Sequence, residues 1–286
     1  MCRLFGFRSV IRSQVHRSLI TADNALGVQS QRHPDGWGVA YYIGGSPHLI
    51  KSADRAMSDQ LFQRVSGVVS SETVVAHIRR ATQGVLSPLN SHPFQYGRWI
   101  FAHNGNVAGF DDLRPALLAR VDPLLRRFVL GETDSEVVFY LLLTHMGRQR
   151  NLHCAGFTVE ELAAAAQETV REVTSLAGDL CADPDGAPDQ NYLTFIVTNG
   201  DIIVGHQGGK PLFFSTHKRV CAERESCSSY GPSCEAATSA GAVNHLVLSS
   251  EPLHGENVWS ALAPHGLVAV DERMRLRFFG ATPVIA

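Results

Sequence analysis

The second residue of the chain, Cys2, has a position that suits nucleophilic chemistry. Removal of Met1 would leave the α-amino group of Cys2 beside its own thiol. The ordinary pKa of an α-amino group is about 8 and that of a cysteine thiol about 8.5, so this amine could serve as the base near neutral pH. A bridging water would relay the proton, because direct transfer within one residue is strained. The alternative is that Cys2 is a small side chain packed beneath the first strand.

Two other segments place polar groups at the ends of predicted strands. The sequence AHIRRATQG presents Arg79, Arg80 and Thr82 after a strand, and the sequence FAHNGN places Asn104 before Gly105. A side-chain amide and a glycine backbone N–H at a strand end can point at one place, as an oxyanion hole requires. Taken alone, this second pattern is weakly specific.

Five motifs in this order resemble those of the class II glutamine amidotransferases. They are MCRLFG at the start, HPDGWG at 33–38, RRATQG at 79–84, HNG at 103–105 and TDSE at 133–136. The motif SSEPL at 249–253 extends the resemblance to stand-alone members, which include the ergothioneine-pathway γ-glutamyl hydrolase and glutathione-degrading amidotransferase-like proteins. The resemblance implies an α+β fold in one domain over residues 1–286, a four-layer αββα sandwich of mostly antiparallel sheets, as in the N-terminal-nucleophile (Ntn) hydrolases.

The resemblance also implies roles for individual residues. Cys2 corresponds to the nucleophile, and Asn104 and the backbone N–H of Gly105 correspond to the groups that stabilise the oxyanion. Arg79 corresponds to the arginine that binds the substrate α-carboxylate, a role that suits a planar group able to bind two oxygens. Asp134 corresponds to the acid that pairs with the substrate α-ammonium.

Several positions carry a second interpretation. Thr82 corresponds to a hydroxyl contact with the substrate, and Arg32 to an arginine that lies over the active site. The family pattern often has tryptophan and histidine where this chain has Arg80 and Gln83, so the leaving-group side departs from the pattern. Arg80 is either a contact for an acidic group beyond the glutamyl unit or a solvated surface arginine. Asp134 also suits the first turn of a helix, where the helix dipole favours negative charge.

The predicted reaction is cysteine-dependent hydrolysis of a γ-glutamyl amide through a glutamyl thioester, with no metal or organic cofactor. Two alternatives stay open: a glutaminase subunit that delivers ammonia to a separate synthase chain, and a non-catalytic protein that binds γ-glutamyl ligands or a partner. Glutamine, glutathione-like peptides and γ-glutamyl amines present the same end to Arg79 and Asp134. The leaving group and the oligomeric state are therefore left open.

The remaining histidines and cysteines lack the spacing of a metal site. Three histidines flank the motifs, and we expect hydrogen-bonded structural roles for them: His77, His92 and His103. Three cysteines in a polar segment have five and then six residues between them, a spacing that suits neither a CxxC zinc site nor a redox pair: Cys221, Cys227 and Cys234.

Composition limits the classes of partner. The chain has 25 Lys and Arg against 27 Asp and Glu, a formal charge of -2, so no global field would draw it to nucleic acid or an anionic membrane. No apolar run approaches the roughly 20 residues needed to span a bilayer. The start of the chain shows no secretory signal, so we expect a cytoplasmic protein with free thiols and a small-molecule substrate.

The elements that must position these residues are mainly strands. Short β-branched and aromatic runs predict them at 36–43, 73–78, 99–103, 192–198, 202–206, 245–250, 267–270 and 276–279. The sequence Asn-Gly-Asp at 199–201 lies between two of these runs and predicts an antiparallel hairpin. Strands in both halves with helices between them favour antiparallel sheets covered by helices.

Two predicted helices begin with the same local pattern. Thr133 stands three residues before Glu136, and Thr158 three residues before Glu161, so each pair matches a capping box. The first helix continues through the apolar residues 137–146, the second through 159–176 with one polar face, and a shorter helix is predicted at 113–121. The polar segments 182–190 and 223–241 are predicted surface that shapes the leaving-group pocket or a partner surface.

Overall fold

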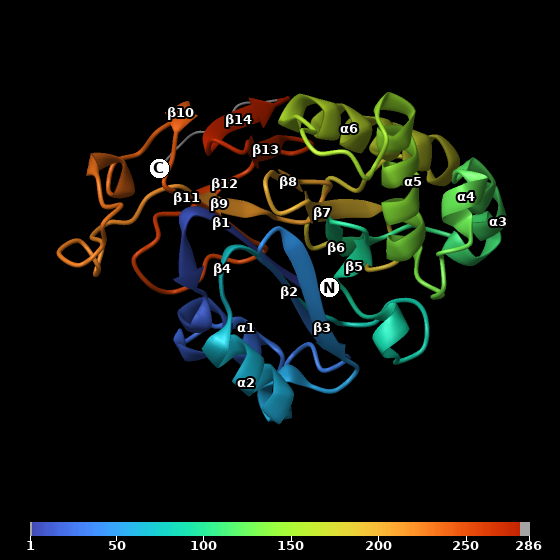
Figure 1. Ribbon diagram of the computed structural model, residues 1–286. Coiled ribbons are helices and arrows are strands. Elements are labelled where there is room, and N and C mark those ends of the chain that lie inside the picture. Colours follow the sequence, from blue (N-terminus) through green and yellow to red (C-terminus); the bar gives the residue numbers. More distant parts are fainter. Residues whose placement is uncertain (1, 281–286) are drawn as a thin grey trace.

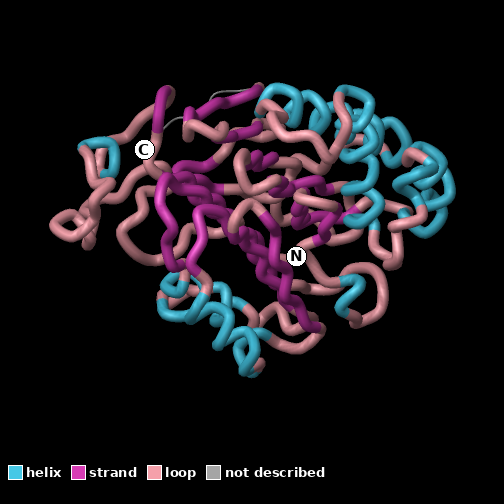
Figure 2. Tube along the Cα trace, in the orientation of Figure 1, coloured by secondary structure: helices cyan, strands magenta, loops and turns pink. Residues whose placement is uncertain are grey.

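A computed structural model describes residues 2–280 and consists of two seven-stranded antiparallel sheets that face each other (Figures 1 and 2). The first sheet, in the order β12-β9-β11-β1-β4-β2-β3, contains β1 (Arg3–Gln14), β2 (Trp37–Ile43), β3 (Ser46–Ser52), β4 (Ser70–Ile78), β9 (Phe213–Ser215), β11 (His245–Ser249) and β12 (Ser260–Ala261). The second, in the order β10-β14-β13-β8-β7-β6-β5, contains β5 (Phe94–Tyr96), β6 (Trp99–Asn106), β7 (Tyr192–Thr198), β8 (Ile203–His206), β10 (Gly241–Ala242), β13 (Leu267–Val270) and β14 (Arg275–Phe279).

Helices cover the outer faces of both sheets, as Figure 1 shows. The first sheet is covered by α1 (Leu26–Gln29) and α2 (Gln60–Val68), the second by α5 (Asp134–Gln149) and α6 (Val159–Ala177), and α3 (Phe110–Arg120) and α4 (Pro123–Arg126) pack against α5. Short 3₁₀ or π turns lie at Arg17–Thr21, Ala56–Ser58, Pro88–Asn90 and Pro232–Cys234. Separate apolar cores fill the space between the sheets and beneath each helical layer, which confirms the predicted αββα sandwich.

The two-residue alternation of the strands brings the ends of β1 and β6 together inside the sandwich. Leu4 of β1 and Ile100 and Ala102 of β6 belong to the core between the sheets. Successive side chains of a strand point to opposite faces, so residues two apart share a face. Cys2 therefore extends the inward row of β1, and Asn104 extends the inward row of β6.

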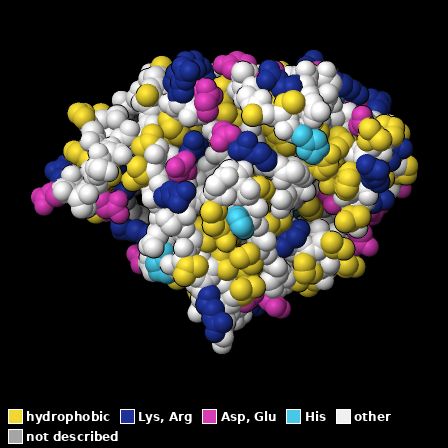
Figure 3. Space-filling model, viewed as in Figure 1, with side chains coloured by type: hydrophobic (Ala, Val, Ile, Leu, Met, Phe, Trp, Pro, Cys, Tyr) yellow, Lys and Arg dark blue, Asp and Glu magenta, His cyan; other side chains and the backbone are white. Residues whose placement is uncertain are grey.

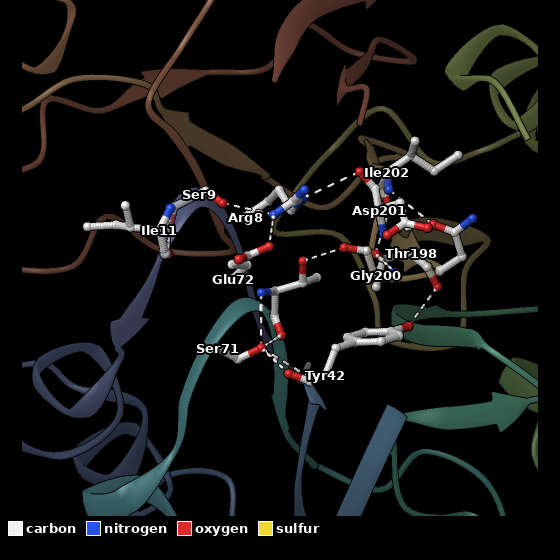
Figure 4. A network of polar contacts seen from close by, with 12 residues as sticks. Arg8, Ser9, Ile11, Tyr42, Ser71, Glu72, Thr198, Gly200, Asp201 and Ile202 are labelled. Atoms are coloured by element: carbon white, nitrogen blue, oxygen red, sulfur yellow. Dashed lines mark hydrogen bonds and ion pairs between the residues drawn. The ribbon is translucent and has the colours of Figure 1, made fainter. Parts of the chain in front are cut away.

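A network of polar contacts joins the two sheets at the end remote from Cys2 (Figure 4). The buried Arg8 of β1 pairs with Glu72 of β4 at 3.4 Å and donates to the backbone carbonyl of Asp201, in the turn between β7 and β8, at 3.4 Å. Tyr42 of β2 donates to the carbonyl of Thr198 at 3.2 Å. These contacts fix the position of one sheet over the other, so they support the alignment of residues at the opposite end.

The predicted strands are all present, with ends that move by one to three residues in several cases. The hairpin predicted around 199–201 is confirmed, because β7 and β8 pair antiparallel with Phe195 opposite His206. The segments 182–190 and 223–241 are mostly exposed, as predicted, although Cys234 is buried.

One of the two predicted capping boxes is wrong in part. Thr158 and Glu161 form the complete reciprocal box at the start of α6. At the start of α5, Thr133 accepts from the backbone N–H of Glu136, but the carboxylate of Glu136 accepts from the N–H of Gly131 at 2.6 Å instead of returning to Thr133. The chain that enters α5 turns so that its earlier N–H groups reach Glu136 first.

The face in Figure 3 carries cationic and acidic side chains interspersed across it. Within residues 2–280, no helix is long and apolar enough to cross a membrane.

Several histidines are buried and held neutral. Burial lowers the pKa of His77 to about 3 and that of His206 and His245 to about 4. In the unfolded chain the ordinary value is about 6.5, so below that pH the unfolded state binds protons that the folded state excludes. As far as these histidines determine it, the unfolding free energy is therefore highest above about pH 6.5 and decreases progressively as the pH falls toward 4.

We expect the loss of stability at low pH to be smaller when one buried histidine is replaced. The Nδ1–H of His206 donates to the backbone carbonyl of Leu193 at 2.8 Å, and a shift of its pKa from about 6.5 to about 4 costs roughly 2 kcal/mol of stability at pH 5. In His206→Asn, the decrease in unfolding free energy between pH 7.5 and pH 5, measured by urea titration, should be smaller by about this amount. His48→Asn, which removes an exposed histidine, is the control. An unchanged pH dependence in His206→Asn would contradict the interpretation.

Candidate active site

Cys2 lies immediately before β1 and is 9% exposed. Its Sγ accepts a hydrogen bond from the backbone N–H of Arg80 at 3.3 Å and lies 3.4 Å from the carbonyl oxygen of Arg80. Burial raises the pKa of the thiol, and the Arg80 N–H and the charge of Arg79 oppose this effect, while Asp134 adds to it. A thiol of raised pKa needs a nearby base to become a nucleophile. The predicted removal of Met1 concerns a residue outside the described part of the chain.

The chain start is fastened by the distant SSEPL motif. The backbone N–H of Leu4 donates to the hydroxyl of Ser250 at 3.0 Å, and the Ser250 N–H donates to the Leu4 carbonyl at 3.1 Å. Arg3 pairs with Glu251 at 3.2 Å. These contacts on either side of β1 position Cys2, which gives the motif a physical role that its sequence pattern alone did not indicate.

Arg79 lies beside Cys2 and is 3% exposed. β1 and β4 pair with Arg3 opposite Ile78, so the next positions along the ladder bring Arg79 next to Cys2. Its guanidinium donates to the carbonyls of Gln83 at 2.6 Å and Val85 at 3.3 Å. A buried guanidinium held by loop carbonyls is positioned to receive a carboxylate.

Asp134 is the first residue of α5 and is 3% exposed. One carboxylate oxygen accepts from the backbone N–H of Val107 at 2.7 Å, and the other accepts from the N–H of Ser135 at 2.7 Å. Burial lowers the pKa of Arg79, and the charge of Asp134 opposes this effect, while the same charge adds to the raised pKa of Cys2. Cys2, Arg79 and Asp134 therefore lie within electrostatic range of one another.

Asn104 and Gly105 follow the inward row of β6. The side chain of Asn104 is buried, its Oδ1 has no hydrogen-bond partner, and no described residue engages its Nδ2 donors. A Cβ at Gly105 would lie 1.9 Å from the carbonyl of Tyr192 and 2.0 Å from Nε2 of His103, so no larger residue fits there. The end of β6 thus leaves the side-chain amide donors of Asn104 without a partner among the described residues.

A cleft of about 1070 Å³ opens beside these residues. Arg3, Arg80, Thr82 and Asn104 line it, and Thr82 is exposed on its wall. Arg32 is also exposed and lies close enough to Arg3 for its charge to lower the Arg3 pKa, an effect smaller than that of burial, but it does not line the cleft.

Other cleft residues were not singled out from the sequence as part of the site. The side-chain amide of Gln83 donates to the Oδ1 of Asn106 at 3.0 Å and to the carbonyl of Val107 at 3.4 Å, and the backbone N–H of the same Val107 donates to Asp134. Lys210 lines the cleft from the opposite side. The difference from the family pattern at Gln83 could have indicated the contact of Gln83 with Asn106. Lys210, in contrast, stands in a polar turn that carries no motif.

No group of histidine, cysteine and acidic side chains within residues 2–280 is arranged to hold a metal ion, and the cysteines there are free. His77 and His103 form hydrogen bonds as predicted. The prediction is wrong for His92, because neither of its ring nitrogens has a hydrogen-bond partner. Its ring instead packs against the rings of His77, at 4.2 Å between centroids, and Phe94, at 4.7 Å.

Solved structures share this architecture. A glutamine aminotransferase class-II domain protein from Silicibacter pomeroyi aligns with a TM-score of 0.60 and 18% identity, over 98% of this chain and all of that one. The glutamine phosphoribosylpyrophosphate amidotransferase of B. subtilis aligns with a TM-score of 0.57 and 14% identity, over 97% of this chain and 49% of that one. At these identities the likeness establishes the fold.

Sequence comparisons identify relatives of this chain. The probable glutamine amidotransferase DUG3 of Saccharomyces cerevisiae is 29% identical over 71% of this chain and 62% of its own length. The γ-glutamyl-hercynylcysteine sulfoxide hydrolase of Mycobacterium tuberculosis is 34% identical over 37% of this chain and 50% of its own. This chain therefore spans less than two thirds of these relatives. The family described as glutamine amidotransferases class-II matches residues 1–276, a span that holds Cys2, Arg79, Asn104 and Asp134, and the chain belongs to that family.

Proposed function

We propose that residues 1–286 form a single amidotransferase domain that hydrolyses a γ-glutamyl amide, with Cys2 as the nucleophile. One observation carries this proposal: Cys2 and Asn104 project inward from the ends of two different sheets, beside the buried charges of Arg79 and Asp134. A buried thiol, free amide donors and two opposite charges in one place suit the cleavage of an amide on a zwitterionic amino acid.

The glutamyl end of the substrate would occupy the buried part of the site. Arg79 receives the α-carboxylate through its guanidinium, and Asp134 receives the α-ammonium. This places the side-chain carbonyl of the substrate over Cys2. Thr82 on the cleft wall adds a hydroxyl contact. Arg32 lies outside the lining of the cleft, and its charge would act on the substrate from beside Arg3.

The reaction then proceeds in two steps, formation of a glutamyl thioester and its hydrolysis. The α-amine of Cys2, freed by removal of Met1, takes the thiol proton through a bridging water, and the thiolate attacks the amide carbon. The Nδ2 of Asn104 and the N–H of Gly105 donate to the oxyanion. The protonated amine gives its proton to the departing nitrogen, which leaves a glutamyl thioester. Water then attacks the thioester, and glutamate departs as the thiol is restored.

The direct test is glutamate release by the purified protein from glutamine and from a panel of γ-glutamyl amides. Release that is absent in Cys2→Ala would support the proposal. If the unchanged protein binds these compounds, as measured by calorimetry, and releases no glutamate, the proposal fails and a non-catalytic γ-glutamyl-binding protein is the remaining account.

A second candidate function is a glutaminase subunit that hands ammonia to a synthase chain. The exposed side chains of Val85, Leu86 and Leu89, which are 64%, 59% and 53% exposed on the loop that follows Arg79, favour a partner at this edge of the site. Glutamine turnover that is slow for the isolated chain, and that rises on addition of cell extract fractionated for such a partner, would support this candidate. Rapid turnover by the isolated chain would oppose it.

Arg79 should act mainly on substrate binding. Because a bidentate guanidinium–carboxylate pair is replaced by a single ammonium contact, Arg79→Lys should lower kcat/KM for glutamine by about 10- to 100-fold, chiefly through KM. 4-Aminobutanamide, which keeps the amine of glutamine and lacks the α-carboxylate, serves as the control substrate, and on it the variant and the unchanged protein should differ little. An equal loss on both substrates would indicate that Arg79 supports only the loop carbonyls of Gln83 and Val85.

A further inference from the structure

The wall of the cleft away from Cys2 is acidic. Asp111 and Asp112, in the first turn of α3, and Asp185 and Asp189, in the loop 182–190, all line the cleft and are exposed. These four residues are called the acidic wall below. Within residues 2–280, none of them forms an ion pair with a cationic side chain.

The two segments of the acidic wall are held against each other by partly buried hydrogen bonds. The backbone N–H of Ala108, just before α3, donates to the side chain of Asn191 at 2.7 Å. The side chain of Asn106 donates to the carbonyl of Gln190 at 3.3 Å. The carboxylates therefore belong to one surface that is joined to the end of β6, the strand that carries Asn104.

The cations that line the same cleft are mostly engaged. Arg3 pairs with Glu251 at 3.2 Å. Lys210 is 5% exposed, its ammonium donates to the carbonyl of Pro184 at 2.5 Å, and it lies 3.8 Å from the centre of the Tyr192 ring. Arg80 is exposed and forms no ion pair with another described residue, and Lys210 lies within electrostatic range of Asp185. The lining of the cleft thus holds three cationic side chains, those of Arg3, Arg80 and Lys210, against five carboxylates, those of the acidic wall and Glu251.

The buried residues indicate which end of the substrate would extend into the cleft. Arg79 and Asp134, which would hold the glutamyl end, are buried and do not line the cleft. Asn104 lines it, with its unpartnered amide at the point where the scissile carbonyl would lie. The group beyond the scissile nitrogen must therefore extend into the cleft, toward the acidic wall. Pro211 and Phe213 line the same space and would contact an aliphatic chain.

We propose that the preferred leaving group is an aliphatic amine that carries a second positive charge, so that the substrate class is γ-glutamyl diamines and polyamines. This inference rests on the proposed hydrolase function and names the substrate class of the same site. The second ammonium pairs with the acidic wall, and the methylene chain packs on the apolar side chains. The reaction is the same acyl transfer: the scissile C–N bond breaks, the nitrogen takes a proton, and the free diamine leaves.

Three substrates of matched length test this proposal: γ-glutamyl-putrescine, γ-glutamyl-pentylamide and γ-glutamyl-γ-aminobutyrate. Their leaving groups end in an ammonium, a methyl and a carboxylate. We expect kcat/KM to be about 10-fold higher for the ammonium substrate than for the methyl one, and lowest for the carboxylate one. The advantage of the ammonium substrate should shrink as salt is raised from 0.05 to about 0.5 M.

Two double variants test whether the acidic wall causes the preference for the ammonium substrate. In Asp185→Asn/Asp189→Asn the ratio of kcat/KM for the ammonium substrate over the methyl substrate should fall to about 1–3. Asp111→Asn/Asp112→Asn gives a second measurement from the other segment, should the loop variant fold poorly. Asp23→Asn/Glu225→Gln removes two exposed carboxylates outside the cleft, and the ratio should stay as in the unchanged protein.

Failure of this inference is distinct from failure of the proposed function. If the methyl or carboxylate substrate is hydrolysed as well as the ammonium one, or if glutamine is hydrolysed and none of the three is, the cationic leaving group is wrong while the hydrolase remains. If neither glutamine nor any of the three is hydrolysed, both proposals fall.

Discussion

Cys2→Ala should lower kcat/KM for any γ-glutamyl amide by about 10⁴-fold or more, because the covalent route through the thioester is lost. Binding of the glutamyl end should persist, since Arg79 and Asp134 are untouched. Cys2→Ser keeps a nucleophile of similar size whose much higher pKa exceeds the reach of an α-amine base, so it should retain only a small fraction of the activity. Initial rates of glutamate release measure both variants.

The control for this prediction is a cysteine elsewhere in the chain. Cys154 is free and exposed, so Cys154→Ala should leave kcat/KM unchanged. Thermal unfolding of all three variants separates a chemical effect from a folding effect. A Cys2→Ala protein that unfolds at the usual temperature and still turns over at more than about a tenth of the normal rate would contradict the nucleophilic role.

Asn104→Leu should lower kcat by about 10²- to 10³-fold with little change in KM, because the oxyanion forms only in the transition state. Leucine is close in shape to asparagine and lacks the donors. The Oδ1 of Asn104 is buried without a hydrogen-bond partner, so its removal should not reduce the unfolding free energy and should raise it slightly.

For Asn104→Leu we therefore expect a loss of activity without a loss of stability. Steady-state kinetics on glutamine and urea unfolding are measured on the same preparation. Asn106→Leu is the comparison, since Asn106 shares the strand and the cleft but bonds to Gln83 and Gln190. A loss of kcat in Asn104→Leu no larger than in Asn106→Leu would place the oxyanion contact elsewhere.

Much of the sheet framework could be predicted because its strands are buried runs bounded by turn residues. The segments at 192–198 and 267–270 are apolar at nearly every position, and each is a buried strand of the second sheet. α5 was recognisable because Thr133 marks its start and residues 137–143 form an unbroken apolar run. In these places local propensity and tertiary burial favour the same structure.

Other elements were not predicted from the sequence. α2 at 60–68 begins after the N-cap Asp59, which accepts from the backbone N–H of Leu61, but its glycine and β-branched residues weaken the helix pattern. Its Phe62 packs against Trp37 of β2, with ring centroids 5.1 Å apart. The long strand β1 carries polar residues in its second half, where its partner β4 shifts register between Arg8 and Ser13. Contacts between distant segments stabilise both elements, and a local pattern does not encode such contacts.

Part of the candidate site could likewise be predicted from the sequence, and part could not. Cys2, Arg79, Asn104 and Asp134 are fixed by motifs at strand and helix ends, and the fold brings them together. The acidic wall depends on the loop 182–190 lying against the start of α3, through Asn191 and Ala108. Sequence spacing does not reveal that two loops about 70 residues apart share one cleft, so the leaving-group side required the structure.

The central claim, that Cys2 with a free α-amine is the nucleophile, is tested most directly by intact-protein and peptide mass spectrometry after incubation with the glutamine analogue diazo-oxo-norleucine. We predict a chain that lacks Met1 and carries one adduct, located on the peptide that begins with Cys2 and absent from Cys2→Ala. A chain that retains Met1 and takes no adduct, or an adduct on another cysteine that persists in Cys2→Ala, would contradict the account.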